Sequence, residues 1–329
     1  MTMTLDLRFE SHPGFRRLFA PGHLTIGLIM PLETYPGRPG PTMNGHLEMA
    51  RLADSSALGA LWMRDIPFYD PHYGDVGQVF ESLIYISALS AVTTSITLGT
   101  AGIILPFREP KILAKQVMSL DHLSDGRMVL GLSSGDRPAE YPIFDIDYST
   151  RGERFRDAFN VYKSISENDF PTFFSSRFGK SEGTHDLIPK AAFEQVPSIA
   201  VGRSQQSLDW IARHMDGLLV PSPPVSSIKS FVTEWQTHVR ETSGSRSFKP
   251  LGIAGYLDLV EDRDYPFEAI RSGFRSGSRT LASFLEVARD AGVNHVAFNP
   301  SISRRPYTDI MDNIIEDILP YFPALSSKS

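Results

Sequence analysis

The chain has 329 residues, of which 41% are hydrophobic, and a net charge of −6, so one α/β barrel or two smaller domains fit its length. The mild acidity argues against nucleic acid and anionic membranes as partners, and the absence of cysteine excludes disulfides, thiolate metal sites and a cysteine nucleophile. We find no metal-binding motif, membrane-length apolar run or signal-peptide core, and therefore expect no bound metal and a cytoplasmic location.

Strand-like runs alternate with helical stretches eight times along the chain. Most of the runs are continuously apolar, which is typical of parallel strands covered by helices. The expected strands are 24–30, 60–65, 96–105, 127–134, 198–202, 216–221, 251–259 and 294–300. Strict alternation predicts a parallel sheet with right-handed crossovers, and eight units favour closure into a (β/α)8 barrel. We therefore expect a single TIM-barrel domain over residues 1–329.

Local signals support several of the helices. Pro110 opens the helix expected over 110–126, and apolar stripes at helical spacing predict two more, over 204–217 and 278–292. The alternative, an open Rossmann-type sheet, lacks its usual G-x-G-x-x-G after the first strand. Between the fourth helix and the fifth strand, residues 169–196 form a loop-like aromatic insertion. Loops of that length are usually functional, with a surface insertion lacking a role as the alternative.

Three segments, in this order, resemble the bacterial luciferase-like family, which includes flavin monooxygenases and deazaflavin-dependent oxidoreductases. They are GALWMRDIPFYD (59–70), ITLGTAGIILPFREPKILAKQVMSLDHLSDGRMVLGLSSGDRPAEY (96–141) and SIAVGRSQQSLDWIARHMDGLLV (198–220). The second segment is the most specific of the three. The resemblance implies a barrel that binds FMN at the C-terminal ends of its strands.

The third strand is the first cofactor contact that the resemblance implies. Family members have a bulge and a non-proline cis peptide here, under the flavin ring, and the matching bond is Ala101–Gly102. Gly99 and Gly102 suit a strand whose backbone is closely approached by another group. Relief of packing between strand and helix is the alternative interpretation of both glycines.

The start of the fifth helix is the second contact. Ser204 is interpreted as the N-cap, with Ser207 three residues later, and the free N–H groups of a helix start stabilise phosphate. Family members hold the flavin phosphate here with hydroxyl side chains, which Ser204 and Ser207 match. Gly202 lets the backbone approach the ligand, and the Arg203 side chain adds a cation. A purely structural cap is the alternative.

The end of the fourth strand, at Ser133 and Ser134, is the third contact and opens toward the barrel mouth. Family luciferases have a phosphate-contacting arginine where Ser134 stands. Arg137, three residues later, is the expected substitute for that charge. A loop salt bridge between Asp136 and Arg137 is the alternative.

The end of the second strand contains the candidate catalytic residues. Bacterial luciferases have an acidic residue followed by a catalytic histidine here; Asp65 keeps the acid, but Ile66 replaces the histidine. His72, on the same loop, is the nearest substitute, with an ordinary surface histidine as the alternative. Asp65 is interpreted as either a proton relay or a strand-end hydrogen bonder. His295, inside an apolar strand, is expected to be a core residue.

Together these features predict an FMN-dependent oxidoreductase, specifically a two-component monooxygenase that uses reduced FMN and O₂ on a small organic substrate. Because no NAD(P)H-binding domain is evident, we expect a separate flavin reductase as partner, and a homo-oligomer, a dimer. The aromatic stretches 68–69 and 170–178 are expected to wall a dry pocket. The alternatives are hydride transfer with a 5-deazaflavin cofactor and a flavin-binding protein without activity, the latter suggested by the missing histidine.

Overall fold

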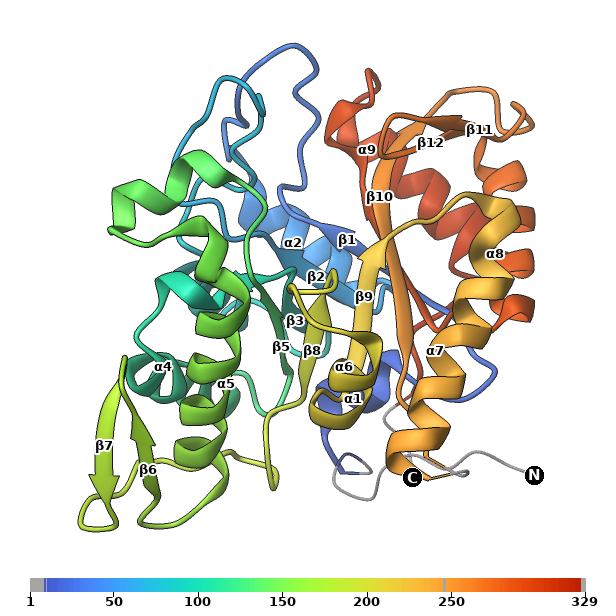
Figure 1. Ribbon diagram of the computed structural model, residues 1–329. Coiled ribbons are helices and arrows are strands. Elements are labelled where there is room, and N and C mark those ends of the chain that lie inside the picture. The colour runs from blue at the N-terminus through green and yellow to red at the C-terminus, as the bar shows by residue number, and fades with distance from the viewer. Residues whose placement is uncertain (1–8, 10, 245–246, 327–329) are drawn as a thin grey trace.

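The computed structural model describes residues 9, 11–244 and 247–326, so the ends of the expected 1–329 domain lie outside the described residues. Within the described part, eight parallel strands follow one another around a closed barrel, and β9 pairs with β10 to complete it (Figure 1). They are β1 (Thr25–Ile29), β2 (Ala60–Met63), β3 (Thr97–Thr100), β5 (Met128–Ser133), β8 (Ser198–Val201), β9 (Gly217–Pro221), β10 (Leu251–Leu259) and β13 (His295–Asn299). Each lies in an expected strand range, and the closure confirms the TIM barrel over the open sheet.

Helices cover the outside of this barrel, except α1, whose Phe15 and Leu18 pack with the side chains of the barrel interior. The helices are α1 (Pro13–Leu18), α2 (His46–Ser55), α3 (Ser82–Ser90), α4 (Pro110–Leu123), α5 (Arg151–Glu167), α6 (Leu208–His214), α7 (Ile228–Ser243), α8 (Ser278–Ala291) and α9 (Tyr307–Asn313). Pro110 is the first residue of α4, as its missing N–H allows. Gly292 ends α8 in the left-handed conformation, at φ 102°. None of the helices in the described ranges is long and apolar enough to cross a membrane.

The barrel interior is filled by side chains. His295 is fully buried at its centre, as expected, where its Nε2 accepts a hydrogen bond of 2.9 Å from Trp62 Nε1. Its Nδ1 lies 2.8 Å from Thr25 Oγ1. Gly27 leaves the space for this pair, because a Cβ there would lie 2.7 Å from the imidazole and 2.8 Å from the indole nitrogen. These contacts join β1, β2 and β13 across the core.

The third strand contains the expected bulge and cis peptide. Gly99 of β3 pairs with Val129 of β5, and Ile103 of the short strand β4 (Ile103–Ile104) pairs with Leu132 of β5. The chain therefore advances four residues on the β3–β4 side for three residues on β5, which is a bulge of one residue. The Ala101–Gly102 peptide within this bulge is cis. The bulged strand therefore carries its irregular backbone at the C-terminal end of the barrel.

Residues 169–196 differ from the loop-like expectation, because part of them forms an antiparallel hairpin. Its strands are β6 (Thr172–Ser175) and β7 (Gly179–Glu182). It packs beside α5 and lies away from the end of the barrel where the other long excursions gather (Figure 1). The expected pocket wall of 170–178 is therefore wrong: the hairpin follows a helix rather than a strand, and this places it outside the mouth.

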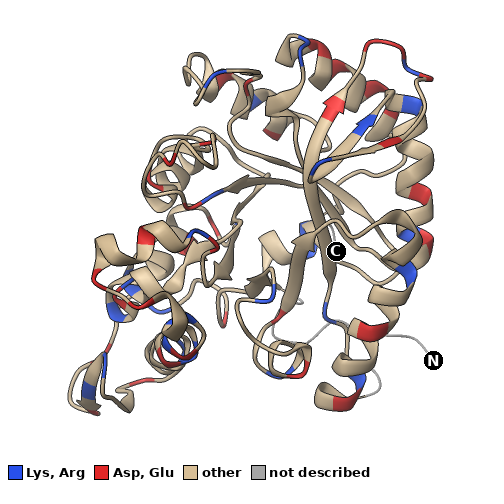
Figure 2. Ribbon diagram, turned by 45° about the horizontal axis from the view of Figure 1, so that its top comes forward, with Lys and Arg blue, Asp and Glu red and all other residues tan. Residues whose placement is uncertain are grey.

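The C-terminal ends of the strands form the mouth of the barrel (Figure 1). The loops after β1, β2 and β5 rise here, and β10 extends into a small sheet with β11 (Glu268–Ile270) and β12 (Gly273–Ser276). Figure 2 turns this mouth forward. Strand β12 pairs with the end of β10, where Asp258 and Arg275 lie opposite each other in register. The mouth is where enzymes of this fold place their chemistry.

Candidate active site

A cleft of about 380 Å³ opens in the mouth between the ends of β2, β3, β5 and β8. We call it the smaller cleft. Most of the residues predicted from the sequence line it: Asp65, Ala101, Gly102, Ser133, Ser134, Arg137, Gly202, Arg203 and Ser204. The structure therefore brings together segments that lie far apart in the chain. Two predicted residues, His72 and Ser207, are not among its lining.

The expected N-cap of the fifth helix is wrong. Helix α6 begins at Leu208, and Ser207 is its N-cap, with a hydroxyl that accepts a 3.1 Å hydrogen bond from the Trp210 amide. Ser204 has φ 48° and lies four residues before the helix, where its hydroxyl donates to the carbonyls of Leu132 and Val201 at 3.2 Å. The predicted cap lies about one turn too early, because both Ser204 and Ser207 satisfy the same local pattern.

The loop before α6 presents open backbone to the smaller cleft. Gly202, Ser204 and Gln205 have positive φ values of 63°, 48° and 60°. A Cβ added to Gly202 would meet no atom within 4 Å, so the space in front of it is free. No described residue accepts a hydrogen bond from the backbone N–H of Ser204 or Gln205. Unpaired N–H groups of this kind suit an anion.

The bulge forms the floor of the smaller cleft together with the end of β5. The Ser133 hydroxyl donates to the Gly102 carbonyl at 3.1 Å, which ties the bulge to its neighbouring strand. A Cβ on Gly102 would lie 2.7 Å from the Val201 side chain. The packing that Gly102 relieves is therefore with a neighbouring strand, β8, rather than with a helix, and both Gly102 and Ala101 line the cleft.

Arg137 lies on the wall of the smaller cleft. Its guanidinium packs over the Tyr73 ring at 4.6 Å and donates to the Asp75 carbonyl at 3.2 Å. Its acidic neighbour is Glu140, at 3.8 Å, rather than the adjacent Asp136 of the alternative interpretation. The Nη1 atom of Arg137 is buried without a hydrogen-bond partner.

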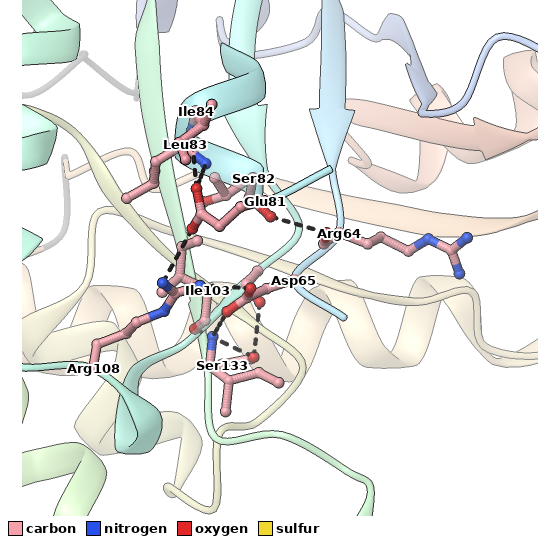
Figure 3. Close-up of polar contacts among 12 residues, drawn as sticks. Arg64, Asp65, Glu81, Ser82, Leu83, Ile84, Ile103, Arg108 and Ser133 are labelled. Carbon is pink, nitrogen blue, oxygen red and sulfur yellow. Dashed lines mark hydrogen bonds and ion pairs between the residues drawn. The ribbon is translucent and has the colours of Figure 1, made fainter. Parts of the chain in front are cut away.

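Asp65 is held at the base of the smaller cleft (Figure 3). Its carboxylate accepts a hydrogen bond of 2.7 Å from Arg108 and another of 2.9 Å from the Ile104 amide, so both carboxylate oxygens are paired. Arg108 also pairs with Glu81 at 3.1 Å. Burial raises the pKa of Asp65, and Arg108 opposes that rise. These contacts are those of the strand-end hydrogen bonder, since they fasten β2 to β4.

His72 lies away from the smaller cleft. Its side chain is 92% exposed and pairs with Asp70 at 2.9 Å. The geometry is that of the surface histidine that the sequence left as the alternative.

Two lining residues of the smaller cleft were missed from the sequence. Arg64 follows β2 directly, and Glu140 stands in the short 3₁₀ helix after β5 (Pro138–Phe144). Burial raises the pKa of Glu140 to about 7. In the sequence, Arg64 immediately precedes Asp65, the acidic residue of the family pattern. This position is the one signal from which Arg64 could have been predicted as a site residue.

Arg64 joins the smaller cleft to a larger one. Its Nη1 donates to Asp75 at 2.6 Å, and Tyr256 donates to the same carboxylate at 2.7 Å. Although burial acts against the charge of Asp75, Arg64 holds its pKa well below the usual range. The larger cleft has a volume of about 790 Å³. Asp75 and Tyr256 belong to its lining, so the ion pair stands in the wall between the two clefts.

Comparisons with known proteins identify the family of the chain. Residues 25–263 match the model of the luciferase-like monooxygenase family. The 4-hydroxyprotoasukamycin monooxygenase of Streptomyces nodosus subsp. asukaensis is 24% identical over 212 residues, which are 63% of this chain and 56% of that protein. Limonene 1,2-monooxygenase of Rhodococcus erythropolis is 28% identical over 115 residues, 35% of this chain and 28% of that protein. The match thus spans little more than half of the first relative.

Solved structures share the fold. Monooxygenase RslO1 from Streptomyces bottropensis superposes with a TM-score of 0.74 at 16% identity, covering 91% of this chain and 99% of that one. An F420-dependent secondary alcohol dehydrogenase in complex with an F420-acetone adduct has a TM-score of 0.73 at 18% identity, covering 90% and 98%. With most of its barrel matched by the family model, the chain belongs to the luciferase-like monooxygenase family.

Proposed function

We propose that the protein is a flavin-dependent oxidoreductase that holds FMN in the smaller cleft and acts as the oxygenating component of a two-component monooxygenase. The observation that carries this proposal is the meeting of the strand bulge, the open loop 202–205 and two largely buried arginines around one cleft. When bound, the cofactor supplies the redox chemistry with O₂, while the protein supplies its position and excludes water.

Orphaned polar atoms support the fit of an anionic, hydrogen-bonding group. Arg64 Nε and Nη2 are buried without a hydrogen-bond partner, in a side chain that lines the smaller cleft, whereas Arg137 Nη1, also without a hydrogen bond, faces Glu140 Oε1 at 3.8 Å. Buried donors are normally paired, so these atoms favour a ligand with acceptors. Loop 202–205, with its two unpaired amides and the Arg203 side chain, would hold the phosphate. Arg64 and Arg137 would bind the polar part of the ring system.

The proposed electron supply is a separate flavin reductase. The barrel uses all the β/α units described, and no dinucleotide fingerprint follows its first strand. Anaerobic stopped-flow reduction of the FMN-loaded protein by NADH and NADPH tests this. We expect slow reduction, and oxygenase activity that requires an added reductase. Reduction at turnover rates by nicotinamide alone would instead identify a self-sufficient flavin reductase.

A deazaflavin-dependent hydride transfer is the second candidate. It is favoured by the fold likeness to the F420-dependent alcohol dehydrogenase. Titration of the protein with FMN and with F420, followed by the fluorescence of each cofactor, separates the two. Tighter binding of F420 would replace the FMN proposal. If FMN binds but a substrate panel gives no turnover with reductase and O₂, the inactive flavin-binding alternative holds.

We also propose a cytoplasmic homodimer. Ile84 on α3 and Ile112 on α4 are exposed large apolar residues on helices that contact each other, and exposed apolar surface is typical of interfaces. Sedimentation velocity of the wild type and of Ile84→Asp tests this surface. We expect a dimer that the charged variant converts to a monomer.

A further inference from the structure

We infer that the larger cleft is the substrate site and that it takes a small aromatic anion, a carboxylate or a sulfonate. This rests on the proposed function, in which the cofactor occupies the smaller cleft. The inference concerns charge and shape on the opposite half of the barrel mouth, which the cofactor assignment does not use.

The first argument is the charge of the larger cleft. Its lining includes four arginines, Arg38, Arg271, Arg275 and Arg304, against the two carboxylates of Asp75 and Asp258. The chain as a whole has a net charge of −6, so this excess of cations runs against the overall balance. The net positive charge of this lining concentrates negatively charged ligands.

Two of these arginines are free to bind a ligand. Arg275 pairs with Asp258 at 2.9 Å, and Arg38 pairs with Glu33 at 3.0 Å. Arg271 and Arg304 have no carboxylate within ion-pair distance among the described residues. A guanidinium presents its donors as a planar fork that matches a carboxylate or sulfonate.

The second argument is the aromatic lining. Tyr35, Tyr69, Tyr73 and Tyr256 all belong to the wall of the larger cleft. Tyr35 and Tyr256 both donate to Asp75, at 3.0 and 2.7 Å, so their hydroxyls are already paired. Tyrosine rings offer flat apolar area to an aromatic ligand. Arginines and tyrosines on one lining therefore indicate an aromatic anion as the substrate class.

The third argument is the position of the larger cleft next to the cofactor cleft. The Arg64–Asp75 ion pair lies between them, and the Tyr73 hydroxyl donates to the Asp136 carbonyl, on the lining of the smaller cleft, at 3.0 Å. A molecule in the larger cleft is thus separated from the cofactor by one layer of side chains.

The arginines do not suit a charged tail of the cofactor. They stand on the loops after β1 and β13 and on the β11–β12 excursion, whereas the proposed phosphate loop follows β8. In the closed sheet, β9 and β10 separate β8 from β13 on one side, and β2, β3 and β5 separate it from β1 on the other. A tail attached at the phosphate would have to cross the mouth to reach them.

The test is calorimetric titration of the full chain with benzoate, benzenesulfonate and the neutral isostere benzamide, with and without FMN. We expect the two anions to bind about tenfold or more tightly than benzamide. Arg271→Gln and Arg304→Gln should each weaken anion binding about tenfold, whereas Arg213→Gln, an exposed arginine of α6 outside both clefts, should leave it unchanged.

Equal binding of benzamide and benzoate, unaltered affinity in both cleft variants, or no detectable binding of either anion would each overturn the inference. FMN affinity is measured in the same titrations. If the protein does not bind FMN but still binds the anions through Arg271 and Arg304, the cofactor assignment is wrong and the anion site stands. If the protein binds FMN but does not prefer the anions to benzamide, the anion site alone is wrong.

Discussion

Arg64 donates from Nη1 to Asp75 Oδ2 at 2.6 Å, and this contact links the linings of two clefts. Only one guanidinium nitrogen of Arg64 is used in this pair, since Nε and Nη2 are buried without partners. Although burial acts against its charge, Asp75 raises the pKa of Arg64 above the ordinary value. The side chain is therefore a fixed cation with donors left over for a ligand.

Replacement of that cation should weaken the cofactor. We expect Arg64→Gln to lower FMN affinity about tenfold or more, because a hydrogen bond to a charged group is lost. Arg279→Gln, an exposed arginine of α8 that pairs with Asp264, is the matched control. Fluorescence titration of FMN into both folded variants measures this. Equal affinity in the two would remove Arg64 from the cofactor site.

Ser204 of the phosphate loop and Ser207, the N-cap of α6, should have separate functions. Ser207→Ala removes the N-cap of α6 and should lower the free energy of unfolding by about 1 kcal/mol, with FMN affinity unchanged. Ser204→Ala should weaken FMN, because its hydroxyl holds the loop against the Leu132 carbonyl. Thermal unfolding and FMN titration of both variants are compared. Weaker FMN binding by Ser207→Ala than by Ser204→Ala would restore the helix-start assignment.

Glu140 should make cofactor affinity depend on pH. Burial raises its pKa to about 7, so the side chain is protonated below that pH and negative above it. It shares its surroundings with Arg137 and with the carboxylates of Asp136, Asp65 and Asp70. A new negative charge in the smaller cleft opposes an anionic ligand, and FMN affinity should therefore fall as the pH rises through about 7.

The phosphate of FMN itself titrates in this pH range, and it does so equally with every variant. The contribution of Glu140 is therefore the difference in the pH profile of FMN affinity between the wild type and the variants. FMN affinity is measured from pH 6 to 8 for the wild type, Glu140→Gln and the exposed control Glu153→Gln on α5. The fall should disappear only in Glu140→Gln. A profile unchanged by Glu140→Gln would show that this carboxyl does not act on the cofactor.

His295 should contribute to acid unfolding. Burial lowers its pKa to about 3, whereas an unfolded histidine titrates near 6.5. Above pH 6.5 neither state binds the proton, so the native contacts are fully effective. Between about 6.5 and 3 only the unfolded state binds it, and stability should fall by about 1.4 kcal/mol per pH unit.

Urea unfolding of His295→Gln across this pH range measures the contribution. The variant should be less stable than the wild type at neutral pH, because the Trp62 contact changes, but it should lose stability less steeply on acidification. His122→Gln, an exposed histidine of α4, should retain the wild-type slope. Parallel slopes for all three proteins would refute a role for His295.

The barrel could be predicted from the sequence because its signals are local. Each strand is a continuous apolar run, and Pro110 and Gly292 mark helix ends by backbone preferences that neighbouring residues hardly alter. The bulge at Ala101–Gly102 could also be predicted, because the family motif that indicates it lies within one short segment of the chain. The N-cap at Ser204 was wrong because two serines satisfied one local rule.

The contents of the clefts were decided by the tertiary structure. Arg64 and Asp75 face each other only after the loop following β2 folds back over the mouth, and Tyr256 reaches them from a strand 181 residues away from Asp75. Burial, which raises the pKa of Glu140 and leaves Arg64 with unpaired donors, depends on atoms from several loops at once. The sequence by itself determined which elements form and in what order, because periodicity and turn chemistry act over a few residues. Which side chains share a cleft, and in what charge state, was decided by the closure of the barrel, because electrostatics and solvation act through space rather than along the chain.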